Sequence, residues 1–135
     1  MKHPVIVTTI VAALSSASAA ETPMPKSLKC EFTSSVFHAW GEETKINSEE
    51  LEMVFDSIDA RAGTARLIGN VGTEDVTLVL TPDHLNFMEI TPSGNINLTT
   101  VYRSLSELLA VHSRHVGDTK RPLLSQHYGT CRPYE

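Results

Sequence analysis

The sequence has little of what several functional classes require. Two cysteines, one tryptophan and 6% aromatic residues are spread over 135 positions. Beyond residue 20, no apolar run approaches the roughly 20 residues that a membrane helix needs, so we expect no stable membrane span. The 11 lysines and arginines are outnumbered by 16 acidic residues and form no cluster, which excludes nucleic acid as the main partner.

Motifs that identify well-known chemistries are also missing. There is no glycine-rich phosphate loop and no Gly-x-Ser-x-Gly elbow, and the histidines do not follow the ligand spacing of a zinc or copper site. We therefore expect no cofactor and no metal, and assign no catalytic residue. A Ser/His/acid set could be drawn only from Ser113, His115, His127 and Glu89, and nothing in the sequence brings these groups together. Enzymatic activity is left open, and its absence is favoured.

The first residues follow the pattern of an exported protein. Lys2 precedes the apolar run Pro4–Leu14, and Ala17–Ala19 fits the small-residue rule for cleavage. We predict a signal peptide over residues 1–20, a loose arm over 21–27 and one domain over 28–135. The remaining chain of about 115 residues is large enough for a single modest core. A periplasmic or secreted location follows from this pattern.

The two cysteines, Cys30 and Cys131, lie near the two ends of the predicted domain. An even number of cysteines in an exported chain predicts a disulfide, and only one pairing is available within a monomer, which we expect this chain to be. The loop that it closes is about 100 residues long, which predicts a stabilisation of about 4–5 kcal/mol. A disulfide also requires that the first and last segments of the domain lie side by side.

Between the cysteines, apolar and polar residues alternate in many short runs, which is the pattern of half-buried β-strands. Leu28, Cys30 and Phe32 show it at the start, and Val76, Leu78 and Leu80 show it in the middle. Turn signals rich in glycine and proline separate about eight such runs, and no helical stripe is present. We predict an all-β antiparallel meander that closes into a roughly eight-stranded barrel, with a β-sandwich as the alternative.

Two polar segments near the C-terminal end supply most of the candidate binding residues. In a strand, His112 and Arg114 share one face, where they could contact an anion, although a polar outer strand face is the favoured interpretation. In the last segment, Gln126 and Tyr128 share one face, while Ser125, His127 and Cys131 share the other. Trp40 either caps a barrel end or lines a ligand mouth. The candidate binding residues are Trp40, His112, Arg114, Gln126, His127 and Tyr128.

Three stretches resemble a group of small exported bacterial proteins of unassigned activity. They are Cys30–Thr33 near the start, Glu89–Thr91 with Gly94–Asn95 in the middle, and the C-terminal segments Val111–His115 and Ser125–Cys131. The resemblance implies an exported, disulfide-closed domain with a polar C-terminal half, and no activity. A tyrosine is usual in that group where this chain has His127, which weakens any claim that His127 is a shared catalytic group.

The favoured hypothesis is an exported, non-catalytic binding module. A protein partner from the envelope or a host ranks above a small ligand, because the apolar side chains are expected to fill a barrel this small. The alternatives are a periplasmic hydrolase that uses His112, His115 or His127, and a structural envelope component.

Overall fold

The structure is a computed structural model, and it describes residues 23–103, 106–117 and 120–135. The predicted signal peptide over residues 1–20 lies outside the described residues, as do the first two positions of the predicted arm. Within the rest of the arm, the carbonyls of Lys26 and Ser27 accept backbone hydrogen bonds from Ile58 and Tyr134, each at 3.1 Å. The described part of the chain contains no helix with the length and apolar character that crossing a bilayer requires.

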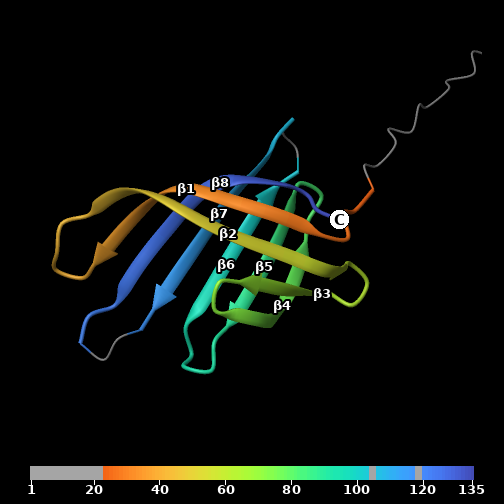
Figure 1. Cartoon of the computed structure of the whole chain (residues 1–135). Helices are drawn as coiled ribbons and strands as arrows, with labels where there is room; N and C mark the ends of the chain where they lie inside the picture. Colours follow the sequence, from red (N-terminus) through yellow and green to blue (C-terminus); the bar gives the residue numbers. More distant parts are fainter. Residues whose placement is uncertain (1–22, 104–105, 118–119) are drawn as a thin grey trace, which may run out of the picture.

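Eight antiparallel strands form a meander that closes into a barrel (Figure 1). They are β1 (Leu28–Ala39), β2 (Lys45–Asp59), β3 (Thr64–Gly69), β4 (Gly72–Leu80), β5 (His84–Ile90), β6 (Ile96–Tyr102), β7 (Leu108–Val116) and β8 (Leu123–Pro133). Each strand pairs with its neighbours in sequence, and β1 also pairs with β8. The predicted barrel is confirmed, and the alternative sandwich is not adopted.

The first two strands are the longest of the eight. β1 continues without a break to Ala39, and β2 begins at Lys45, before the alternating run of Leu51, Met53 and Phe55. A bulge between Phe32 and Ser34 interrupts the pairing of β1 with both of its neighbours. Bulges bend a strand and increase its twist, so this one helps two long strands to follow the curve of a narrow barrel.

Gly129 permits the closest backbone contact at this bulge. A Cβ atom at position 129 would lie 1.9 Å from the carbonyl oxygen of Glu31 and 2.7 Å from the Cα of Phe32. Real Cβ atoms do not come this close to a backbone, so only glycine lets β8 pack against the bulged part of β1.

The disulfide between Cys30 and Cys131 joins β1 to β8 and confirms the predicted pairing. The two residues are direct partners in the register, with their Cα atoms 4.0 Å apart and 101 positions apart in sequence. The bond therefore lies across the seam at which the first strand meets the last.

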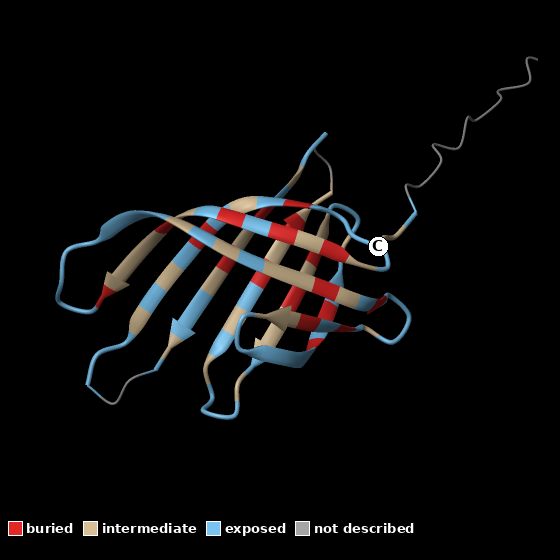
Figure 2. Ribbon diagram, viewed as in Figure 1, coloured by how far each residue is buried: buried red, intermediate tan, exposed pale blue. Residues whose placement is uncertain are grey.

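The interior has two different ends. We call one end of the barrel the closed end: the first and last residues of the described domain lie there, together with the β2–β3, β4–β5 and β6–β7 loops. The opposite end of the barrel is the open end. The core occupies the closed end, and most buried segments in Figure 2 lie there. The core residues are Leu28, Cys30, Phe32, Phe55, Ile58, Ala65, Leu67, Val76, Leu78, Leu85, Phe87, Val101, Ala110 and Cys131.

Candidate functional site

The open end of the interior is lined by polar side chains, and β5 to β8 supply neighbouring ones. In the register, Glu89 of β5 is opposite Asn97 of β6, which is opposite Arg114 of β7, which is opposite Ser125 of β8. One step deeper, Thr99 is opposite His112, and His112 is opposite His127. Directly paired residues point to the same face of a sheet, so these side chains form two inward-facing rows above the apolar core.

His112 belongs to the deeper row and is only 2% exposed. Its Nδ1 atom forms a hydrogen bond of 2.8 Å with the hydroxyl of buried Thr99. Burial, together with the smaller effects of the nearby His127 and Arg114, lowers the pKa of His112 to about 3. The imidazole is therefore neutral at neutral pH and closes the bottom of the polar region without adding charge.

His127 is partnered at both ring nitrogens. Its Nε2 atom lies 3.0 Å from the hydroxyl of Ser125, two residues earlier on the same strand. Its Nδ1 atom contacts the carboxylate of Glu49 on β2. The imidazole ring lies 5.5 Å from that of His112, measured between centroids. Ser125, His127 and Glu49 therefore form one connected chain of hydrogen bonds inside the barrel.

A cavity of about 270 Å³ opens beside these rows. Its apolar wall comes from β2, β3 and the β3–β4 turn, and its polar wall comes mainly from β4 to β7. The apolar lining residues are Leu51, Met53, Leu67 and Val71, and the ionisable or amide residues are Glu74, Glu89, Asn97, His112 and Arg114. A volume of this size is close to the lower limit of ligand pockets, so the cavity suits a small molecule.

Two polar groups in this cavity have unused hydrogen-bonding capacity. Asn97 donates from Nδ2 to Glu89 at 2.7 Å, but its buried Oδ1 atom has no hydrogen-bond partner within the described part of the chain. The guanidinium of Arg114 forms no ion pair with any residue that the structure describes. A buried acceptor without a donor is costly, so a ligand that donates to Asn97 would stabilise the site.

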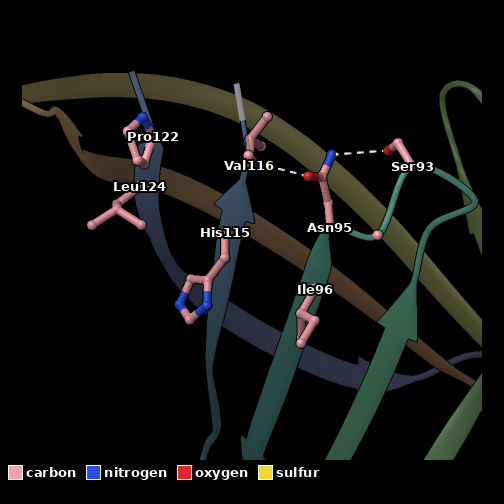
Figure 3. Close-up of a pocket in the computed structure, with 9 residues that line it drawn as sticks. Ser93, Asn95, Ile96, His115, Val116, Pro122 and Leu124 are labelled. Atoms are coloured by element: carbon pink, nitrogen blue, oxygen red, sulfur yellow. Dashed lines mark hydrogen bonds between the residues drawn. The ribbon is translucent and has the colours of Figure 1, made fainter. Parts of the chain in front are cut away.

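A second hollow, of about 320 Å³, lies on the outside between the β5–β6 and β7–β8 loops (Figure 3). Its main polar side chain is Asn95, and both the oxygen and the nitrogen of this amide have hydrogen-bond partners. The Oδ1 atom accepts from the Gly117 amide at 2.8 Å, and the Nδ2 atom donates to the Ser93 hydroxyl at 3.1 Å. The remaining wall is largely Ile96, Val116, Pro122 and Leu124, with His115 at one side. Although this hollow is larger, it contains no buried polar group, and we therefore treat the interior cavity as the candidate site.

The predicted binding residues divide between the inside and the outside of the barrel. His112, Arg114 and His127 meet in the interior, so the interpretation of His112 and Arg114 as a polar outer face is wrong. The alternation fixed which residues share a face, but it could not tell the inner face from the outer one. Gln126 and Tyr128 lie outside, joined by a hydrogen bond of 2.8 Å.

Trp40 takes neither of its two predicted places. It lies in the turn after β1 with 68% of its surface exposed, and it lines neither the core nor the interior cavity. The turn itself is tied to the β7–β8 loop by a hydrogen bond of 3.2 Å from the Trp40 amide to the carbonyl of Pro122.

The sequence analysis missed Glu49 and Asn97 and gave Ser125 no role. Glu49 lies 78 positions from His127 in the sequence, so only the closure of the barrel brings the two together. Asn97 could have been placed on an inward face from its alternation with Thr99 and Val101. Among the described residues, no group of three or more histidine, cysteine or acidic side chains could hold a metal ion.

Fold and site together define an exclusively β, disulfide-closed barrel with an apolar closed end and a polar cavity at its open end. The sequence matches no protein-family model, and no curated protein and no solved structure is significantly similar to it.

Proposed function

We propose that this protein is an exported binding module that holds a small amphipathic ligand in the open end of its barrel. The observation that supports the proposal best is the cavity of about 270 Å³, whose lining combines Arg114, which has no ion-pair partner among the described residues, with the apolar side chains of Leu51 and Met53. Eight-stranded barrels are just wide enough to hold one small ligand. The disulfide supports export, because such bonds persist in oxidising compartments.

The lining residues indicate the chemistry of the ligand. Arg114 suits an acidic group, and the free Oδ1 atom of Asn97 requires a hydrogen-bond donor. The two carboxylates of Glu74 and Glu89 also favour a ligand with a donor or an ammonium group. We therefore infer a small amphipathic acid that also carries an amino or hydroxyl group.

Isothermal titration with three matched compounds tests this proposal. They are an amino acid with a branched apolar side chain, the same compound without its amino group, and the same compound without its carboxylate. We expect the strongest binding for the amino acid and the weakest for the amine. Arg114→Gln should weaken binding of both acids by about 10-fold or more, since a charge-assisted hydrogen bond is lost. Arg61→Gln, in the β2–β3 turn at the closed end, is the matched control.

Amide chemical shifts locate the bound compound. In a ¹⁵N-labelled protein, the signals that move on titration should belong to the open ends of β2, β5, β6 and β7. Shifts confined to the outer hollow of Figure 3, or no shift at millimolar concentrations of all three compounds, would show that the proposal is wrong.

A protein partner is the second candidate, and one observation favours it. The outward positions of β5, β6 and β7 include no Asp, Glu, Lys or Arg, and several of them are exposed apolar residues, such as Ile90, Ile96 and Leu98. Gln126 and Tyr128 adjoin this surface on β8. Capture of one partner from periplasm or culture medium, lost on Tyr128→Glu but not on Arg114→Gln, would favour this candidate over the interior ligand.

A further inference from the structure

The hydrogen-bonded chain of Ser125, His127 and Glu49 has the order of groups that activates a serine. A hydroxyl lies within hydrogen-bond reach of one nitrogen of an imidazole, and a carboxylate holds the other nitrogen. This combination of nucleophile, base and orienting group is the diagnostic arrangement of nucleophilic catalysis. We propose that Ser125 is an acyl-accepting nucleophile and that the open end of the barrel hydrolyses small esters. The proposal goes beyond ligand binding and does not depend on the ligand inferred above.

The direction of the proton transfers follows from the groups present. An ionised carboxylate can only accept hydrogen bonds, so the Nδ1–H group of His127 donates a hydrogen bond to Glu49 and keeps its proton. In the neutral ring, Nε2 is then the acceptor, and the hydroxyl of Ser125 donates to it across 3.0 Å. Glu49 therefore acts as a positioning residue that selects the tautomer in which His127 can serve as a general base.

A basic residue is paired with the proposed nucleophile in the sheet. Arg114 is the direct partner of Ser125 in the β7–β8 register, so their side chains leave neighbouring points of the same inner face. Arg114 also lines the cavity, which gives the acyl part of a substrate an apolar wall to contact. An unpaired guanidinium beside the nucleophile can stabilise the oxyanion of a tetrahedral intermediate.

The reaction balances with water as the only co-substrate. The Oγ atom of Ser125 bonds to the ester carbonyl carbon, its proton passes to Nε2 of His127, and the carbonyl oxygen becomes an oxyanion beside Arg114. When the intermediate collapses, the bond to the alcohol oxygen breaks and the alcohol leaves with the proton from His127. Water then attacks the acyl-serine, gives its proton to His127, and releases the carboxylic acid as Ser125 regains its proton.

The proposal gives the buried cluster a role that burial alone does not explain. His127 is 7% exposed, whereas Ser125 is only part-buried and is the register partner of Arg114, which lines the cavity. The nucleophile therefore remains accessible while its base is shielded from water.

Labelling with a small dialkyl fluorophosphonate tests the proposal directly on the disulfide-bonded protein. The reagent phosphonylates an activated serine and releases fluoride, and intact-mass and peptide measurements locate the adduct. We expect one adduct per folded chain, at Ser125, and none on the reduced and unfolded chain. Hydrolysis of 4-nitrophenyl acetate should show a burst that disappears after labelling.

Four variants distinguish the roles. Ser125→Ala should abolish the adduct, and His127→Gln and Glu49→Gln should each slow labelling by about 10²-fold. Glu49→Gln should leave the affinity of the cavity for the acids described above unchanged. A substitution that merely disturbed the structure would lower that affinity as well. Ser113→Ala, on the outer face of β7, should label at the wild-type rate. Failure of the folded wild-type protein to label at Ser125, or labelling that Glu49→Gln leaves unaffected, would overturn the proposal, even if ligand binding holds.

Discussion

The closed and open ends of the barrel are made from the same eight strands but from different kinds of residues. At the closed end, Phe32, Phe55 and Phe87 fill the interior, and the disulfide crosses the seam. At the open end, the inward positions are taken by Glu49, Arg114 and other polar residues, and a cavity remains. Buried polar groups stabilise a fold less than apolar packing does, so we assign stability to the closed end and propose recognition for the open end.

The largest expected effect comes from removing the disulfide at the closed end. In the double variant Cys30→Ala/Cys131→Ala, the loop of 101 residues is no longer constrained in the unfolded chain. We expect the free energy of unfolding to fall by about 4 kcal/mol, measured by urea denaturation monitored by circular dichroism. A loss below about 1 kcal/mol would mean that the disulfide adds little to the stability that the pairing of β1 with β8 already provides.

Truncating one apolar side chain at each end compares the two directly. Phe55 is 1% exposed and stacks on Phe87 with the ring centroids 4.0 Å apart, so Phe55→Ala should cost about 3–5 kcal/mol. Leu51, four residues earlier on β2, is only partly buried beside the cavity, and Leu51→Ala should cost less than half as much. Equal losses in denaturant unfolding would contradict the division into a stabilising end and a recognition end.

The free energy of unfolding should depend on pH through His112, which lies at the boundary between the two ends. Burial lowers the folded-state pKa of this residue to about 3, below its unfolded value of about 6.5. Between these two pKa values the unfolded chain binds more protons than the folded protein does. The contribution of His112 to stability is therefore complete above pH 6.5 and is lost as the pH falls toward 3. From pH 7 to pH 5 we expect a loss of about 2 kcal/mol in the free energy of unfolding.

His112→Gln should remove this part of the pH dependence, whereas His115→Gln, an exposed position on the same strand, should preserve it. Urea unfolding at the two pH values measures both variants. An unchanged slope in His112→Gln would show that other groups control the acid sensitivity.

The smallest effect is expected at Trp40. Because its side chain is 68% exposed and belongs to neither the core nor the cavity lining, Trp40→Phe should change the free energy of unfolding by less than about 0.5 kcal/mol. Ligand affinity in the titrations described above should also be unchanged. A loss of affinity would extend the recognition end to the β1–β2 turn.

The sequence was sufficient for the fold because two independent signals agree. Alternation such as Leu28, Cys30 and Phe32 predicts strands, and the wide separation of the two cysteines requires the first and last strands to meet. The bulge between Phe32 and Ser34 was not predictable, since it depends on how β1 must curve between two partners. The early start of β2 has the same origin: a polar segment joins the sheet because β1 offers it a partner.

The site was less predictable than the fold for a physical reason. Period-two alternation correctly grouped Ser125 with His127, and His112 with Arg114, but a polar residue can occupy either face of a strand. Only the register shows that these two pairs are neighbours inside the barrel. Glu49 joins them through tertiary structure alone.

The neighbouring ends of the described domain have a consequence for topology. Leu28 and Pro133 are direct partners in the register, and every other pair of neighbouring strands is consecutive in the sequence. The barrel is thus a ring of eight strands in which the chain links every pair of neighbours except β8 and β1. A circular permutant that links the present ends by a short loop and opens the chain between Asn70 and Val71 would keep every pairing. In such a permutant the cysteines would belong to adjacent strands of one hairpin, and a bond that now spans the whole domain would become a local one.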